Sequence, residues 1–269
     1  MARKAIFITG GGSGIGRAIA LRFAAEGWFI GLGDIDEQGM EATAAMLAGA
    51  AFRFRFDVRD REAWDEALRG FANASGGRID VLANNAGVPL GGPLAELSRE
   101  EIDRTLDINL KGVIYGAQAA YPWLKASAPG SCLLNTASAA ALYGMPSQSI
   151  YAAAKAGVRS LTETLDGEWQ PDGIRVRSLM PSFIDTPLLS HAPNARSNVP
   201  IRQVVTTAGL EFTPVEEVAD NAWAAIQGDK VHYLVGKTAR KMRFAAKWMP
   251  GQLRKRAAQL MKAHEDATE

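Results

Sequence analysis

Short apolar runs alternate with segments of helical hydrophobic period along most of this 269-residue chain. The runs are rich in β-branched and aromatic residues, which favour strands, and glycine or polar residues follow them. They predict seven strands, at residues 4–9, 29–34, 52–58, 79–85, 131–138, 175–180 and 231–236. Because helical segments separate these runs, we expect an α/β fold with a doubly wound parallel sheet and helices on both faces.

Glycine-rich or polar motifs follow five of the predicted strands. They are TGGGSGIG at 9–16, FDV at 56–58, NNAG at 84–87, NTAS at 135–138 and MPSFIDTP at 180–187. In a parallel sheet the carboxyl ends of the strands lie at one edge, and ligands bind there where the winding reverses. The pattern therefore predicts a ligand site at this edge, in a single domain of residues 1–236.

Two segments differ from this alternation. Residues 181–213 form a long connection with four prolines and little helical period, and loops of this kind are usually lids, so we expect them to cover the substrate. Residues 237–269 form a C-terminal extension that Pro250-Gly251 should divide into two helices. The apolar positions that recur there at helical spacing are Phe244, Trp248, Leu253, Ala257, Leu260 and Met261.

The loop at 9–16 has the features of a dinucleotide-binding turn, because it follows a strand and opens a helix. Glycines let the backbone approach a pyrophosphate closely, and the helix amino terminus offers free N–H groups. We expect Gly10 to make the tight turn and Gly14 and Gly16 to allow the close approach. The same cofactor-binding loop contains Gly12, Ser13 and Ile15.

Asp34 ends the second predicted strand, eighteen residues after Gly16. An acid at this distance is expected to bind the ribose hydroxyls of NAD and to repel the 2′-phosphate of NADP. Neither Ser13 nor Ile35, which should border the same ribose, is basic. We therefore expect NAD rather than NADP, and we assign nearby Asp36 to a helix cap.

Together these residues resemble the short-chain dehydrogenase/reductase family in its compact form. The resemblance covers residues 4–236 and rests on motifs in the family's order and spacing, namely TGGGSGIG, Asp57-Val58, NNAG at 84–87, Asn109 in INLKG, Ser138, and Tyr151 with Lys155. It implies a Rossmann-like fold and an oxidoreductase that acts on alcohols or ketones.

The resemblance also assigns cofactor contacts. It implies that Asp57 and Val58 bracket the adenine, and that Asn85, Ala86 and Gly87 line the adenosine side. The nicotinamide carboxamide would be held by Pro181, Ile184 and Thr186. The family's usual Pro-Gly is Pro181-Ser182 here, which could alter the loop.

Tyr151 and Lys155 lie one helical turn apart and can meet over one site. Alcohol oxidation needs a base, and we expect Tyr151 to serve because a nearby ammonium and a positive nicotinamide favour the phenolate. Ser138 would bind the substrate oxygen, Lys155 would also bind the nicotinamide ribose, and Asn109 would hold a water that leads to solvent. Each residue also has an ordinary structural interpretation, as a turn serine, a solvated lysine or a buried asparagine.

Two other functions remain open. A dinucleotide-binding regulator or sensor would keep the glycines but would not need Ser138, Tyr151 and Lys155. A sugar-nucleotide epimerase or dehydratase usually has a longer chain and a shorter glycine spacing. No metal site is expected.

The expected substrate site is mostly apolar, which favours a hydrophobic secondary alcohol or ketone. The residues that we place at the substrate are Ser138, Ala140, Tyr143, Tyr151, Phe183 and Leu188. The surrounding wall would include Ala139, Leu142, Met145, Pro146, Leu189 and His191.

Charge is uneven along the chain, although its net value of +1 gives no reason to expect nucleic acid as a partner. Residues 237–262 hold nine of the 30 Lys/Arg residues and no Asp/Glu, so the extension is basic and the rest is acidic. Basic amphipathic helices can lie on anionic membranes. We nevertheless favour packing of the extension on the acidic body or on a partner subunit.

The remaining expectations concern the cellular compartment and the oligomeric state. The single cysteine, Cys132, excludes an intrachain disulfide and is typical of a reducing compartment. The amino-terminal MARKAIFITG lacks a signal peptide's apolar region, and no run reaches the roughly 20 apolar residues of a transmembrane helix. We expect a cytoplasmic homodimer or homotetramer, with helices that start near residues 99 and 150 forming the dimer.

Overall fold

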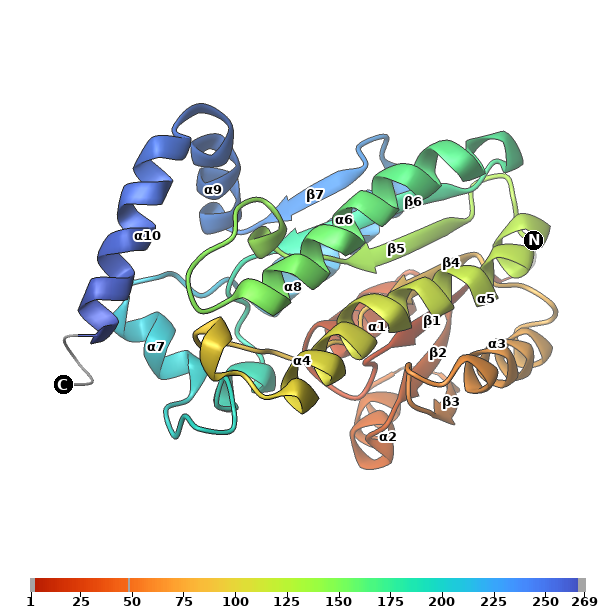
Figure 1. The fold of residues 1–269 in the computed structure, drawn as a ribbon. Helices are drawn as coiled ribbons and strands as arrows, with labels where there is room; N and C mark the ends of the chain where they lie inside the picture. The colour runs from red at the N-terminus through yellow and green to blue at the C-terminus, as the bar shows by residue number, and fades with distance from the viewer. Residues whose placement is uncertain (1–2, 48, 266–269) are drawn as a thin grey trace.

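The computed structural model describes residues 3–47 and 49–265, which form a seven-stranded parallel sheet with helices on both faces (Figure 1). The strands are β1 (Ala5–Thr9), β2 (Phe29–Asp34), β3 (Phe52–Arg55), β4 (Val81–Asn84), β5 (Cys132–Thr136), β6 (Arg175–Pro181) and β7 (His232–Val235). Their order across the sheet is β3-β2-β1-β4-β5-β6-β7. The winding reverses between β1 and β4, so the predicted doubly wound, Rossmann-like fold is confirmed.

The central strands are covered on both faces, which explains their continuous apolar sequences. Every residue of β1, β4 and β5 is buried. The predicted strand ends differ from the structure most at 52–58, because β3 ends at Arg55. The pairing of β3 with β2 ends where β2 ends, at Asp34. After β3 the chain turns, and the carbonyl of Asp57 accepts a hydrogen bond from the N–H of Asp60 (3.0 Å).

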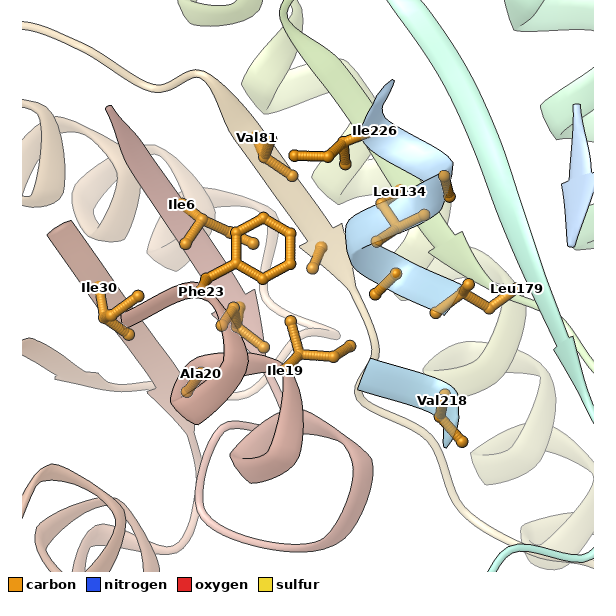
Figure 2. Packing of buried hydrophobic residues seen from close by; sticks show 14 of the residues in the cluster. Ile6, Ile19, Ala20, Phe23, Ile30, Val81, Leu134, Leu179, Val218 and Ile226 are labelled. Atoms are coloured by element: carbon orange, nitrogen blue, oxygen red, sulfur yellow. The ribbon is translucent and has the colours of Figure 1, made fainter. Parts of the chain in front are cut away.

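One helical layer consists of α1 (Gly14–Ala25), α2 (Glu37–Ala45) and α8 (Val215–Gln227). Figure 2 shows how α1 and α8 meet over this face of the sheet, with the ring of Phe23 close to Ile6 and Val81. The buried side chains that join α8 to the same cluster are Val218, Ala222, Ala225 and Ile226.

The opposite layer consists of α3 (Arg61–Ala74), α5 (Gly112–Ala126) and α6 (Ser149–Trp169). Trp64 and Phe71 from α3 pack with Phe7 of β1, and all three are fully buried. The short helix α4 (Arg99–Leu106) starts with a capping box between Ser98 and Glu101. A π-helical turn, Asp107–Lys111, joins α4 to α5.

The segment 181–213 is less irregular than its sequence indicates. It contains a 3-10 helix, Pro187–Ser190, and α7 (Ile201–Thr207). The weak helical period of the sequence did not indicate these two short helices, and the expected role in covering the substrate stays a prediction. Prolines precede or begin both helices, and a fixed φ suits the first turn of a helix.

The C-terminal extension forms two helices, α9 (Lys237–Trp248) and α10 (Pro250–Glu265), at one end of the molecule beyond β7 (Figure 1). The predicted break at Pro250-Gly251 is confirmed. Residues 266–269 and the side chains of Leu260 and Met261 lie outside the described residues. No helix of the described chain has the length and apolar character to cross a bilayer.

We expected the extension to pack on the body or on a partner subunit; the structure shows packing on the body at α9, and packing on a partner subunit stays a prediction. Ala239 of α9 is fully buried, but Phe244 and Trp248 are exposed. The hydrophobic spacing in the sequence identified the helix but could not show which side of it faces the body.

Candidate active site

The glycine turn between β1 and α1 is built for close backbone approach. Gly10 and Gly14 have positive φ angles of 67° and 49°, which side chains disfavour. A Cβ on Gly16 would lie 2.1 Å from the carbonyl oxygen of Gly10, so only glycine closes this turn. Ser13 stands at the start of α1, and its side chain makes no cap hydrogen bond. The turn thus presents helix N–H groups suited to a dinucleotide pyrophosphate, with Gly12 and Ile15 in the same loop.

Asp34 is tied directly to this turn. Its Oδ2 accepts a hydrogen bond from the N–H of Gly12 at 2.9 Å, and its Oδ1 accepts one from the N–H of Asp36 at 3.1 Å. Asp36 caps α2 by accepting from the N–H of Gly39 at 3.0 Å, as expected. Ile35 is largely exposed beside it.

Two arginines lie beside the glycine turn and Ile35. The sequence reasoning missed them because it looked for cations only at Ser13 and Ile35. Arg17 donates to the carbonyl of Gly12, and Arg55 Nε donates to the carbonyl of Ile35 at 3.2 Å. Neither forms an ion pair with Asp34 among the described residues. Their placement depends on how α1 and β3 meet β2, which no local spacing reveals.

Asp57 and Val58 follow β3. The Asp57 carboxylate accepts from the Arg59 guanidinium at 2.6 Å and from the Arg59 N–H at 2.9 Å. The Arg59 side-chain hydrogen bond holds the pKa of Asp57 below its usual range. Val58 is buried against Gly112, and its carbonyl accepts from the Trp64 indole at 2.9 Å.

The loop after β4 is locked to its neighbours by two threonines that sequence reasoning missed. Thr9 Oγ1 accepts from the N–H groups of Asn85 (3.0 Å) and Ala86 (3.1 Å), and Asn85 Nδ2 donates to the Thr9 carbonyl at 3.0 Å. The Thr136 hydroxyl donates to Asn85 Oδ1 at 3.3 Å. The Asn85 amide therefore joins the ends of β1, β4 and β5. The only sequence signal is that a threonine ends both β1 and β5.

Tyr151, Lys155 and Ser138 meet at the carboxyl edge of the sheet. Tyr151 lies in the first turn of α6, and the ammonium of Lys155 is 5.8 Å from the centre of its ring. Ser138 starts the 3-10 helix Ala139–Ala141 after β5, where its Oγ accepts from the N–H of Ala140 at 3.2 Å, and its side chain neighbours Tyr151. Lys155 Nζ donates to the Thr136 carbonyl at 2.9 Å.

Asn109 completes this group from the π-helix Asp107–Lys111 and is fully buried. Its side-chain amide accepts from the N–H of Val88 and donates to the carbonyl of Val88, both at 2.8 Å. A Cβ on Gly87 would lie 3.0 Å from Asn109 Oδ1 and 3.6 Å from Lys155 Nζ. Gly87 therefore lets the asparagine and the lysine approach the same loop.

Burial shifts both titratable groups of the pair. It lowers the pKa of Lys155 to about 8, because the ammonium loses its hydration. It also raises the pKa of Tyr151 above its ordinary value, although the neighbouring Ser138 side chain opposes the rise. Desolvation of the phenolate therefore outweighs the effect of Ser138 on the pKa. The expected help of the ammonium and a bound nicotinamide to the phenolate stays a prediction.

The two ends of the segment 181–213 lie together beside the site. Ile184 is buried and forms a β-bridge with Thr213, and Thr213 N–H donates to the Phe183 carbonyl at 2.8 Å. Thr186 packs on the glycine turn, where its Cγ2 would be 3.2 Å from a Cβ on Gly14. Ser182 donates to the Val235 carbonyl at 3.4 Å, next to the buried Pro181.

Three loops join on the substrate side. The sequence reasoning missed one of them, the part of the loop after β4 that contains Gly91 and Gly92. Gly91 N–H donates to the Pro193 carbonyl at 2.9 Å, and Asn194 Nδ2 donates to the Gly91 carbonyl at 2.6 Å. Gly92 N–H donates to the carbonyl of Ser147 at 2.7 Å. The loops after β4, β5 and β6 thus form one wall.

The expected substrate residues lie on this wall with different exposure. Ala140, Tyr143 and Phe183 are half-buried, whereas Leu188 and His191 are exposed and Leu189 is buried. A separate cavity of about 180 Å³ lies at the opposite, amino edge of the sheet, beside Arg3 and Trp28. That cavity touches none of the catalytic candidates.

Comparison with known proteins places this arrangement in a family. The family model for short chain dehydrogenases matches residues 4–197. The chain therefore belongs to the short-chain dehydrogenase family and is an oxidoreductase.

Individual relatives agree with this assignment. The chain is 34% identical over 242 residues to 3-oxoacyl-[acyl-carrier-protein] reductase FabG of Thermotoga maritima, a match that covers 87% of this chain and 94% of the relative. It is 34% identical over 243 residues to 3beta-hydroxysteroid dehydrogenase 1 of Eggerthella lenta, covering 87% and 90%. A short-chain dehydrogenase of Burkholderia phymatum, solved with NAD, matches with a TM-score of 0.81 and 29% identity over 93% of this chain and 95% of that one. These likenesses support a nicotinamide cofactor.

The lowered pKa of Lys155 has a measurable effect on stability. An unfolded lysine keeps a pKa near 10.5, so above pH 8 the unfolded chain binds more protons than the folded chain. The free energy of unfolding should therefore rise by a few kcal/mol between about pH 8 and pH 10. Lys155→Met should remove this increment, whereas Lys230→Met at an exposed position should keep it. Urea titrations across this range measure it, and equal pH slopes in wild type and Lys155→Met would contradict the assignment.

Proposed function

We propose that the protein is an NAD(H)-dependent oxidoreductase that interconverts a hydrophobic secondary alcohol and its ketone, with Tyr151 as general acid and base. The observation that carries the proposal is the meeting of Ser138, Tyr151, Lys155 and Asn109 beside the glycine turn. The four residues come from three separate segments, namely the turn after β5, the start of α6 and the π-helix Asp107–Lys111, and ordinary structural roles would not require these segments to converge.

Tyr151 and Ser138 handle the substrate oxygen in this proposal. The bound nicotinamide supplies or accepts the hydride. In ketone reduction the Tyr151 phenol donates its proton to the substrate oxygen, and in alcohol oxidation its phenolate takes the proton back. The Ser138 hydroxyl bonds the same oxygen and stabilises its developing charge in a site with little water. The raised pKa of Tyr151 keeps the phenol protonated, which suits its role as an acid.

Lys155 and Asn109 support the proton transfer. The Lys155 ammonium favours the phenolate and binds the nicotinamide ribose, and its pKa of about 8 lets it exchange a proton near neutrality. The Asn109 side chain uses one of its two amide hydrogens and one lone pair in bonds to the backbone of Val88. In the proposal Asn109 also holds the water that links Lys155 to solvent.

NAD is the proposed cofactor because Asp34 borders the glycine turn. Its carboxylate is positioned by Gly12 and would face the adenosine ribose, where a 2′-phosphate would meet a like charge. The remaining cofactor contacts come from the residues predicted by the family resemblance. They are Gly10, Ser13, Gly14, Ile15, Gly16, Ile35, Asp57, Val58, Asn85, Ala86, Gly87, Pro181, Ile184 and Thr186.

The apolar wall supports a hydrophobic substrate. Ala140, Tyr143, Phe183 and Leu188 offer methyl, ring and aliphatic surface with a single hydroxyl. The Eggerthella lenta relative, which is 34% identical to this chain, is named for a hydroxysteroid, and that name fits a hydrophobic secondary alcohol as substrate.

Tyr151→Phe tests the proposed acid and base. Removal of one hydroxyl should lower turnover by about 10²- to 10⁴-fold while NADH binding stays within about twofold. The measurement is absorbance of the reduced nicotinamide with a panel of alcohols and ketones, together with NADH fluorescence titration. Tyr121→Phe, whose hydroxyl bonds Asp172 just before β6 at the amino edge of the sheet, is the matched control and should keep full activity.

The same experiment separates the alternatives. If wild type binds NADH but turns over no alcohol or ketone, a regulatory or sensor protein replaces the enzyme. If Tyr151→Phe retains wild-type turnover, another group is the acid. Turnover of a sugar nucleotide without net change in NADH would indicate an epimerase or dehydratase.

Asp34→Asn tests the cofactor preference. The amide keeps a hydrogen-bond acceptor for Gly12 but removes the charge that opposes a 2′-phosphate. The ratio of kcat/KM with NADP to kcat/KM with NAD should rise by at least about tenfold. Asp36→Asn should leave the ratio unchanged, because asparagine caps a helix as well as aspartate. A wild-type enzyme that already prefers NADP would contradict the assignment and would point to Arg17 and Arg55.

A further inference from the structure

Helix α9 has one side packed on the molecule and one side turned to solvent. Ala239 is fully buried, and Met242, Ala245 and Ala246 are half-buried on the inner side. The helix packs against β7 and against the 3-10 helix Ala139–Ala141, which directly follows Ser138. The inner side of α9 therefore lies next to the turn that contains Ser138, and its outer side faces away from that turn.

Two large aromatic side chains occupy the middle of that outer side. Phe244 is 59% exposed and Trp248 is 65% exposed, the latter being the most exposed large hydrophobic side chain recorded for the described residues. At about 100° per residue, Lys237, Phe244 and Trp248 lie within roughly 40° of one another, opposite Ala239. The basic residues that flank this aromatic centre are Arg240 and Lys247 on one side and Lys241 on the other.

The charged residues that the extension itself contributes up to residue 262 are all basic. Residues 237–262 contain nine Lys/Arg and no Asp/Glu. Lys237 and Arg240 are held by the body, through Glu211 at 3.2 Å and Glu217 at 3.5 Å. Lys241 and Lys247, which flank the aromatic centre, have no ion pair within the described part of the chain, and Lys247 lies over the ring of Trp248. Their charges are therefore available to an external partner.

We propose that the outer face of α9, together with the basic helix α10, docks the protein on an anionic phospholipid surface. Lysine and arginine attract the headgroups, and the Phe244 and Trp248 rings enter the boundary between headgroups and acyl chains. Contact is peripheral, since no described helix is long and apolar enough to cross a bilayer. This proposal does not rest on the proposed reaction, because it needs only α9 and α10.

A flat anionic surface fits these observations better than an acidic protein. A protein interface of ordinary size would cover its aromatic centre with a shaped apolar pocket. Here two aromatic rings project from a convex helix among spread cations, which is the arrangement of interfacial membrane helices. Leu188, Val199 and Val204, in the segment 181–213, add exposed apolar side chains on the substrate side of the molecule. Docking through α9 would bring that side near a source of lipophilic substrate.

Vesicle co-sedimentation of the full-length protein tests the proposal. The vesicles are phosphatidylcholine with about one third phosphatidylglycerol, and neutral phosphatidylcholine vesicles are the comparison. Wild type should sediment with the anionic vesicles at low salt and should be released at about 1 M salt, where charges are screened beyond roughly 3 Å. Binding to neutral vesicles should be at least about tenfold weaker.

Two double variants locate the contact. Phe244→Ala with Trp248→Ala, and Lys241→Glu with Lys247→Glu, should each lower partitioning by at least about tenfold. Met46→Ala and Arg69→Glu are matched controls at exposed positions elsewhere and should partition like wild type. Circular dichroism and NADH binding confirm that each variant is folded.

Three results would overturn the proposal. The first is no sedimentation of wild type with anionic vesicles at low salt. The second is equal loss of binding in the control variants. The third is a change of mass in light scattering, without lipid, when Phe244 and Trp248 are replaced, because a second copy of the chain would then cover this face.

Discussion

The parallel register of the central strands is the constraint on which the candidate active site depends. It brings the ends of β1, β4 and β5 to one edge, where Thr9, Asn85 and Thr136 bond to one another. Lys155 then takes its position from the carbonyl of Thr136. A slip of one residue in any of these strands would turn these side chains to the other face. The apolar residues that keep these strands buried in one register therefore also fix the positions of the polar side chains at the strand ends.

Burial of Tyr151 and Lys155 has two opposite effects. It makes each charged form costly, which raises the pKa of the phenol and lowers the pKa of the ammonium to about 8. The same low polarity strengthens every remaining interaction between charges and dipoles in the site. A half-buried phenol and a buried ammonium whose pKa values both lie away from their ordinary ranges suit proton transfer better than they suit stability.

Much of the fold follows from the sequence because the strands are continuous apolar runs and the loops contain glycine or polar motifs. The same motifs identified the candidate site residues, and the structure brings Ser138, Tyr151, Lys155 and Asn109 together. What the sequence could not supply depends on which loops meet. The hydrogen bonds of Thr9 and Thr136, and the contact of Gly91 with Asn194, are tertiary. Helix α7 is too short for a hydrophobic period, and the outward side of α9 is set by its packing on β7.

A crystal structure of the protein with NAD and a bound ketone or alcohol tests the central claim most directly. The account predicts that the substrate oxygen lies within hydrogen-bond distance, about 2.6–3.2 Å, of both Tyr151 Oη and Ser138 Oγ. It also predicts that Lys155 Nζ bonds the nicotinamide ribose while the pyrophosphate lies on the Gly10–Gly16 turn. A substrate oxygen bound away from Tyr151, with the phenol still packed against Ser138, would contradict the account.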